Sequence, residues 1–130
     1  MRVRVAAGVI RHGGKILLAR RSPGQKLAGY WEFPGGKLEN GEDPHSALER
    51  EIREEFLLEI VPLRTLITYH HSYDFGDLEL IGILADAGDR ELTLHVHDDA
   101  QWISPGELAA YTLAPADELL ARYVRETPYA

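Results

Sequence analysis

The stretch from Gly36 to Leu58, which reads GKLENGEDPHSALEREIREEFLL, constrains this chain more than any other part. Asp43 followed by Pro44 predicts a helix start, because a carboxylate caps free backbone amides and proline fits the first helical position. We expect the helix to end near Leu57. Its residues at helical spacing form an apolar stripe, which predicts that one face is buried; the stripe consists of Leu48, Ile52 and Phe56.

The flanking segments predict strands on both sides of this central helix. The expected strands are residues 3–11, 15–20, 63–71, 78–85, 91–97 and a short one at 102–103. A capping box at 104–107 predicts a short helix, and Pro115 begins a C-terminal helix that ends near Arg125. Pro34-Gly35-Gly36 predicts a break between regular elements. This order predicts one domain over residues 1–130 of the α+β class, an α/β/α sandwich with a mixed β-sheet between helices.

The charge and cysteine content exclude several functions. The chain has 21 acidic and 14 basic residues, a net charge of −7, and no cysteine. The acid excess argues against binding duplex nucleic acid through a basic face, and the lack of cysteine excludes thiolate zinc sites and thiol nucleophiles. The N-terminal residues alternate in polarity as a strand does, and no apolar run approaches the roughly 20 residues of a membrane helix. We therefore expect a cytoplasmic protein with no membrane partner.

Three carboxylates share one face of the predicted helix beside its apolar stripe. Glu51, Glu54 and Glu55 stand at positions i, i+3 and i+4, where like charges repel unless they are neutralised. Mg²⁺, or Mn²⁺ in its place, prefers carboxylate oxygens and retains water for a substrate phosphate. Arg50 lies four residues before Glu54 and is expected to pair with it. The alternative interpretation is an ordinary solvated acidic face.

The loop before the helix supports the metal interpretation. Gly35 and Gly36 allow backbone groups to approach a metal or phosphate closely, and Glu42 is expected to fold back towards the acidic face. Loop and helix together therefore predict a metal–phosphate site.

The spacing from Gly36 through Glu42 to the run Arg50-Glu51-Ile52-Arg53-Glu54-Glu55 strongly resembles the Nudix box. The segments WEFPGGKLENGE and LAPAD, the latter at residues 113–117, are similar to the MutT branch, in particular to its CTP-pyrophosphohydrolase-like members. The resemblance implies a Nudix fold and Mg²⁺-dependent hydrolysis of a nucleoside triphosphate to the monophosphate and pyrophosphate. Cytosine nucleotides and oxidised purine nucleotides are both candidate substrates, the latter in nucleotide pool sanitation.

The same resemblance implies roles for individual residues. Its metal ligands are the Gly35 carbonyl and the carboxylates of Glu51, Glu54 and Glu55, with Arg50 orienting a ligand; the general base is one of the glutamates or a carboxylate near Asp98. Four residues are expected to contact the nucleotide: Arg21, Phe33, Lys37 and Asp117. Asp117 would accept from an exocyclic amino group such as N4 of cytosine. The alternatives are a helix cap for Asp117, a core aromatic for Phe33, and surface cations for Arg21 and Lys37.

Two positions depart from the family pattern. Leu57 stands where the box has a glycine that usually ends the helix, so we expect the helix to continue or to end differently, with activity retained. Val96 stands where MutT-like enzymes have a further metal-binding glutamate. Asp98 and Asp99 are the nearby candidates to replace it.

The sequence also bears on an alternative function, on zinc binding and on assembly. A non-catalytic Nudix-like module that binds a nucleotide or damaged base is the alternative to an enzyme, but the box acids are all present. The pairs His70-His71 and His95-x-His97 lack a thiolate or third ligand, so surface or core histidines are preferred over zinc. A homodimer is expected because the family is often dimeric.

Overall fold

The computed structural model describes residues 2–127 of the 130-residue chain. Met1 and residues 128–130, which the predicted domain includes, lie outside the described residues. The strands are β1 (Arg2–His12), β2 (Lys15–Arg20), β3 (Trp31–Glu32), β4 (Gly35–Lys37), β5 (Ile60–Tyr73), β6 (Gly76–Ala87) and β7 (Asp99–Ile103). The helices are α1 (Pro44–Phe56), α2 (Glu118–Glu126) and the 3₁₀ segments η1 (Pro105–Ala110) and η2 (Pro115–Asp117).

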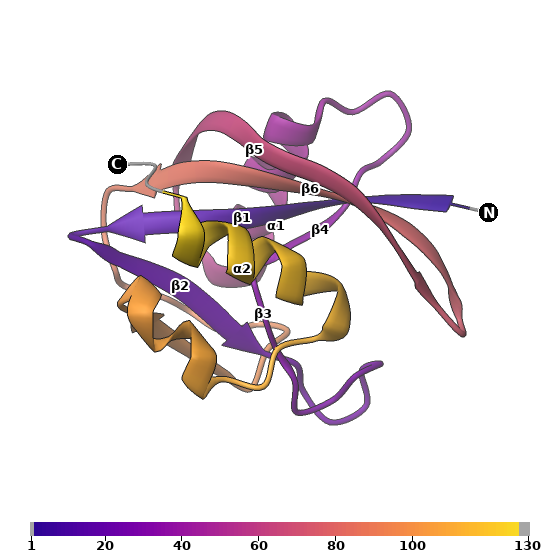
Figure 1. The fold of residues 1–130 in the computed structure, drawn as a ribbon. Coiled ribbons are helices and arrows are strands. Elements are labelled where there is room, and N and C mark those ends of the chain that lie inside the picture. Colours follow the sequence, from indigo (N-terminus) through magenta and orange to yellow (C-terminus); the bar gives the residue numbers. More distant parts are fainter. Residues whose placement is uncertain (1, 128–130) are drawn as a thin grey trace.

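All seven strands of the described chain join one mixed sheet in the order β3-β2-β1-β6-β5, with β4 paired to β1 and β7 paired to β2. β1 runs parallel to β6, and the other pairings are antiparallel. β1 lies at the centre of the sheet, with α1 behind it and α2 in front (Figure 1). Within residues 2–127, no helix has the length and apolar content needed to cross a membrane.

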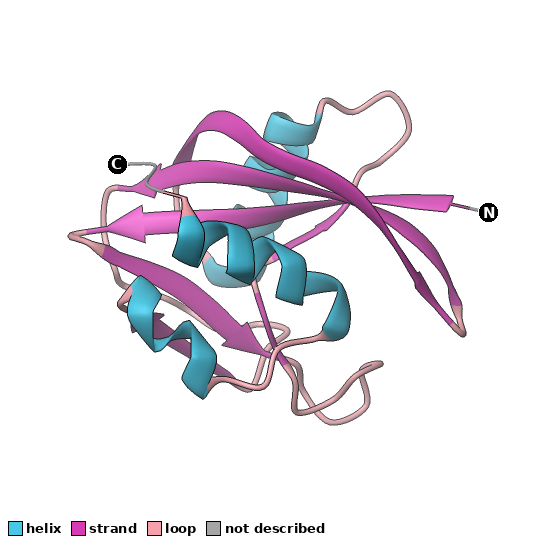
Figure 2. Cartoon of the chain, viewed as in Figure 1, coloured by secondary structure: helices cyan, strands magenta, loops and turns pink. Residues whose placement is uncertain are grey.

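The core explains why the helices cover both faces of the sheet. Successive side chains of a strand point to opposite faces, so Ala7 and Val9 of β1 pack on one side while Ala6 and Ile10 pack on the other. The first side is covered by α2 through Leu120, Ala121 and Val124. The second side is covered by the predicted apolar stripe of α1, Leu48, Ile52 and Phe56, which is fully buried. The predicted α/β/α sandwich is confirmed (Figure 2).

The prediction of a strand at 91–97 is wrong. The segment is irregular, and Leu94 and Val96 are exposed rather than directed inward. Its backbone amides instead bond the end of α1: Thr93 N–H donates to the Phe56 carbonyl at 3.0 Å, and His95 N–H donates to the Glu55 carbonyl at 3.2 Å. The last carbonyls of a helix have no partner within it. Here they accept from the amides of this segment, which therefore do not pair with a neighbouring strand.

The expected break at residues 34–36 is also corrected in part. Gly35–Lys37 forms the short strand β4, in which Gly35 and Gly36 lie opposite Ala7 and Ala6 of β1. The two glycines are therefore held rigidly against the central strand, and this fixes the loop that precedes α1.

Helix α1 begins as predicted and ends on a strained residue. The Asp43 carboxylate accepts hydrogen bonds from the amides of His45 and Ser46, both at 3.1 Å, and Pro44 occupies the first turn. The helix ends at Leu57, whose φ of 52° and ψ of 39° lie in the left-handed region. Leucine thus adopts the conformation for which glycine is usually selected at a helix end, so the expectation that the helix would continue or end differently at Leu57 is wrong.

Replacing Leu57 with glycine is expected to stabilise the protein by up to about 1 kcal/mol. A non-glycine residue in the left-handed region costs about 1–2 kcal/mol, which the greater entropy loss of glycine offsets in part. Little burial is lost because Leu57 is 61% exposed. Urea unfolding measures the change, with Leu57→Ala as the control that retains a Cβ atom. An equal gain in both variants would contradict backbone strain as the cause.

Candidate active site

One cleft, with a volume of about 630 Å³, collects most of the predicted site residues at the end of the sheet where β1 and β6 begin. It is bounded by β4, α1, the loop at 25–27 and the tip of the β5–β6 hairpin. The predicted residues that line it are Arg21, Phe33, Gly35, Gly36, Lys37, Glu51, Glu55 and Asp117. Segments from both halves of the chain therefore meet in a single cleft.

Arg50 is the centre of an ion-pair network below the cleft. Its guanidinium donates to both carboxylate oxygens of Glu42, at 2.8 and 2.9 Å, and to Glu51 and Glu54, each at 3.1 Å. Glu42 folds back towards the acidic face, and the pairing of Arg50 with Glu54 is present, both as predicted. The hydrogen bonds from Arg50, and one from the Glu39 amide, lower the pKa of Glu42 to about 2. Arg50 thus orients the Glu51 carboxylate from behind.

Glu51 and Glu55 lie one helical turn apart and meet at the floor of the cleft. Burial raises the pKa of Glu55 to about 9, with further contributions from the Glu51 charge, a hydrogen bond to Glu51 and the charge of Glu32, against a smaller opposing effect of Arg21. The Oε1 atom of Glu55 is buried and has no hydrogen-bond partner among the described residues. A buried carboxylate oxygen without a partner is costly unless a cation or proton satisfies it.

Gly36 allows the Glu51 carboxylate to lie directly against β4. A Cβ atom at position 36 would lie 2.3 Å from the carboxyl carbon of Glu51 and 2.5 Å from its Oε2. Only glycine therefore permits this carboxylate to occupy its place without displacement.

Three predicted carboxylates lie outside the cleft. The Glu54 side chain is 60% exposed and bonds Arg50 instead of joining Glu51 and Glu55. Asp98 forms an ion pair with Arg20 at 2.8 Å, while Asp99 accepts from the amide of Ala100. Neither aspartate is brought to the position left by Val96, which does line the cleft.

The paired carboxylates fit a divalent cation. In residues 2–127, no group of three or more aspartate, glutamate or histidine side chains converges on one metal position. Mg²⁺ commonly uses one or two carboxylates and fills its remaining positions with water and substrate phosphate. The Glu51–Glu55 pair, with the unpartnered Glu55 oxygen, meets that requirement, and a bound cation would stabilise the charged form of both carboxylates.

The predicted substrate residues line the cleft from the segments that follow β2 and β3, from β4 and from η2. Arg21 donates to Glu32 at 2.8 Å and to the Lys26 carbonyl, so its guanidinium is held in place rather than being a free surface cation. Lys37 is exposed at the rim, and no ion pair of its ammonium group is found within the described chain. Phe33 combines both of its interpretations, because it is buried in the core and also lines the cleft.

Asp117 is a buried carboxyl at the edge of the cleft. It is 7% exposed, and its Oδ2 accepts a hydrogen bond from the Phe33 amide at 2.8 Å. It precedes α2 but makes no side-chain cap there, so the alternative role as a helix cap is not found. Burial raises the pKa of Asp117 to about 8, with a further contribution from the Glu32 charge and partial relief from the Phe33 amide and Arg21.

A contact that the sequence did not predict joins His97 and Glu32 in the same cleft. His97 Nε2 is 2.7 Å from Glu32 Oε2, and the imidazole stacks on Phe56 with its side chain only 2% exposed. The contact joins residues 65 positions apart, and no local pattern reports such a distance. The preference for a core histidine is met at His97, and Glu32 emerges as the common neighbour of Arg21, Glu55 and Asp117.

Stability is expected to fall as the pH rises from about 4 to about 8, in part through Asp117. The folded carboxyl retains its proton up to its raised pKa of about 8, whereas the unfolded one releases it near the ordinary aspartate pKa of 3.8, so the folded state binds more protons in this window. The contribution approaches about 1.4 kcal/mol per pH unit. Thermal unfolding of Asp117→Asn should therefore depend less on pH than that of wild type. The exposed Asp74→Asn is the control; parallel profiles for all three proteins would contradict the assignment.

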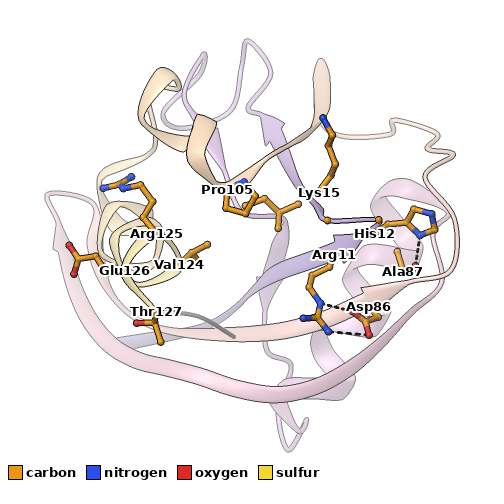
Figure 3. A pocket seen from close by; sticks show the side chains of 13 residues that line it. Arg11, His12, Lys15, Asp86, Ala87, Pro105, Val124, Arg125, Glu126 and Thr127 are labelled. Atoms are coloured by element: carbon orange, nitrogen blue, oxygen red, sulfur yellow. Dashed lines mark hydrogen bonds and ion pairs between the residues drawn. The ribbon is translucent and has the colours of Figure 1, made fainter. Parts of the chain in front are cut away.

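A second hollow, of about 790 Å³, lies at the opposite end of β1. Figure 3 shows Arg11 paired with Asp86 there, and His12 Nδ1 lies 2.8 Å from the Ala87 carbonyl oxygen. None of the predicted site residues lines it.

Comparison with known proteins agrees with this fold. The chain is 36% identical over 115 residues to the CTP pyrophosphohydrolase of Escherichia coli (strain K12), covering 88% of this chain and 85% of that protein. It is 32% identical over 127 residues to the 8-oxo-dGTP diphosphatase of Haemophilus influenzae, covering 96% and 93%. The solved structure of the MutT NUDIX hydrolase from Burkholderia pseudomallei has a TM-score of 0.84 and 25% identity, covering 95% of this chain and 98% of that one.

The fold, a mixed sheet between two α-helices, is that of the MutT Nudix hydrolases. Residues 5–123 match the family described as the NUDIX domain, and the chain belongs to the Nudix family. The predicted class of enzyme, a Nudix hydrolase that cleaves a phosphoanhydride, is confirmed.

Proposed function

We propose that this chain hydrolyses a nucleoside triphosphate to the monophosphate and pyrophosphate with Mg²⁺ as cofactor. The observation that carries the proposal is the Glu51–Glu55 pair on the cleft floor, where one buried oxygen of Glu55 lacks a partner. Similarity to a CTP pyrophosphohydrolase and to 8-oxo-dGTP diphosphatases supports a triphosphate substrate.

The residues of the cleft suggest how the substrate is held. Glu51 and Glu55 are placed to bind the cation, and the carbonyl of Gly35 is the proposed backbone ligand. When bound, the cation would neutralise phosphate charge and lower the pKa of a bound water. Lys37 at the rim is available to meet a phosphate oxygen.

Base recognition is assigned to the opposite side of the cleft. Phe33 forms an apolar wall there, and Asp117 presents a carboxyl whose orientation is fixed by the Phe33 amide. A carboxyl group bonds an exocyclic amino group when charged and can also donate when protonated. We propose that a cytosine or oxidised purine base contacts Asp117.

Pyrophosphate release tests the proposed function. Wild-type protein with Mg²⁺ is assayed on CTP, dCTP, dGTP and 8-oxo-dGTP, with EDTA as the metal-free control. We expect turnover of at least one triphosphate that EDTA abolishes. Absence of turnover on every substrate, together with a nucleotide-induced rise in Tm without metal, would instead indicate a non-catalytic nucleotide-binding module.

Asp117→Asn tests base recognition separately. Loss or reversal of one base-edge hydrogen bond is worth about 1–3 kcal/mol of discrimination, so we expect the ratio of kcat/KM between the best and worst triphosphates to change about 10-fold. An equal fall on all substrates would contradict the base-reading role of Asp117.

A further inference from the structure

Two tyrosines of β5 hold the backbone immediately before Asp117. The Tyr73 hydroxyl accepts a hydrogen bond from the Ala116 amide at 2.7 Å. The Tyr69 hydroxyl donates to the Ala116 carbonyl at 2.5 Å and accepts from the Leu120 amide at 3.2 Å. Both backbone groups of Ala116 are therefore bonded to phenols that come from a strand more than 40 residues away.

The two tyrosines are suited to hold this segment firmly. They are four residues apart on one strand, so both side chains point to the same face of the sheet. Each packs its ring against the core on the α2 side, and burial raises the pKa of both hydroxyls, which remain protonated at neutral pH. We call Tyr69 and Tyr73 the tyrosine clamp.

The other side of the same segment is fixed by β3. The Trp31 amide donates to the Thr112 carbonyl at 2.9 Å, and the Ala114 amide donates to the Trp31 carbonyl at 2.8 Å. Asp117 then accepts from the Phe33 amide. The segment at 112–117 is thus held between β3 and β5, and the carboxyl group of Asp117 has a defined position at the edge of the cleft.

We propose that Tyr69 and Tyr73 are positioning residues that determine base selectivity by fixing Asp117. The inference rests on the proposed function, because it assumes that Asp117 contacts the base. Discrimination between bases is a difference of affinities, and it requires the discriminating hydrogen-bond group to be held in one place. A loosened turn would let the Asp117 carboxyl adapt to several bases, so selectivity would fall while hydrolysis of the triphosphate continues.

The test is a double-mutant cycle with phenylalanine substitutions, which retain the ring and remove only the hydroxyl. Tyr69→Phe, Tyr73→Phe and Asp117→Asn are made singly, and each tyrosine variant is also combined with Asp117→Asn. The measured quantities are kcat and KM for pyrophosphate release on the four triphosphates. Tyr123→Phe on α2 is the matched control, since no hydrogen bond of its hydroxyl is found in the described chain.

We expect each tyrosine variant to lower the selectivity ratio about 5- to 10-fold, mainly through KM of the preferred triphosphate. In the Asp117→Asn background the same substitution should have no further effect, because residues that act through one group are not additive. Tyr123→Phe should leave the ratio unchanged.

Three outcomes overturn the inference. Unchanged selectivity in both tyrosine variants shows that the clamp is not needed. Additive losses in the double variants show that Tyr73, which itself lines the cleft, contacts the base independently of Asp117. If Asp117→Asn leaves selectivity unchanged, Asp117 does not discriminate between bases, and the clamp has no group through which to act.

A second measurement separates this inference from the proposed function. If wild type hydrolyses no triphosphate, the proposed function fails, and amide hydrogen exchange then tests the clamp. Because the Phe33 amide bonds the Asp117 carboxyl, loss of the Tyr73 hydroxyl should speed exchange at Phe33 by about 10-fold if it moves Asp117. Unchanged exchange at Phe33 in Tyr73→Phe overturns the clamp on structural grounds.

Discussion

Replacing Glu55 with glutamine is expected to lower kcat for triphosphate hydrolysis by about 10²–10⁴-fold, the range associated with loss of a positioned acid–base group. Glutamine is isosteric, but it supplies no negative charge for a cation and no base for a proton. The Glu55 Oε1 atom is buried and has no hydrogen-bond partner among the described residues, so no neighbouring side chain substitutes for it. Pyrophosphate release with saturating Mg²⁺ measures the loss, and Mn²⁺ titration calorimetry measures cation affinity.

Glu49→Gln is the matched control for this experiment. Glu49 lies on the same helix, but its carboxylate bonds Arg53 at 3.4 Å and does not line the cleft. It should retain wild-type kcat within about 2-fold, since an exposed i,i+4 pair contributes only about 0.3–0.5 kcal/mol. Glu55→Gln protein that turned over at the wild-type rate would remove Glu55 from both catalysis and metal binding.

Gly35→Ala is expected to lower the free energy of unfolding by about 3 kcal/mol or more, which is the largest loss of stability among the substitutions proposed for this protein. A Cβ atom at position 35 would lie 1.8 Å from the backbone oxygen of Ala6, and no side-chain rotation relieves a clash with backbone. The pairing of β4 with the central strand β1 must therefore open. We expect Tm to fall by about 10 °C. Urea unfolding measures the loss in the free energy of unfolding.

Two other glycine-to-alanine substitutions serve as comparisons for Gly35→Ala. Gly106→Ala should be neutral, because a Cβ atom there meets nothing within 4 Å and φ is ordinary. Gly36→Ala should lower activity more than stability, because the added Cβ displaces the Glu51 carboxylate rather than backbone. If Gly35→Ala were as stable as Gly106→Ala, the tight β1–β4 contact would be contradicted.

Local patterns predicted α1 well, because its determinants are adjacent in sequence. Asp43 and Pro44 set its start, and the period of Leu48, Ile52 and Phe56 set its buried face. The same kind of pattern failed at 91–97, where alternating apolar residues resemble a strand. Alternation shows only that apolar residues recur at every second position. It does not show that the backbone amides of this segment bond the carbonyl groups at the end of α1.

The box spacing also placed the candidate site, but not its geometry. Helical period brought Glu51, Glu54 and Glu55 to one face, whereas the structure leaves Glu54 on Arg50 and brings Glu51 and Glu55 to the cleft. Which of the three carboxylates lines the cleft depends on the groups that each long side chain contacts at its end. Backbone periodicity does not contain that information.

Sequence alone determined the family pattern, the central helix and the acidic face that predict a metal-dependent phosphate site, because these depend on neighbours within one or two helical turns. The tertiary structure alone decided which residues surround that site. Contacts of Glu32 with His97, of Asp117 with Phe33 and of the tyrosine clamp with Ala116 span 65, 84 and 43 to 47 positions. They form only because burial of both faces of the sheet brings β3, β5 and the segment before α2 together.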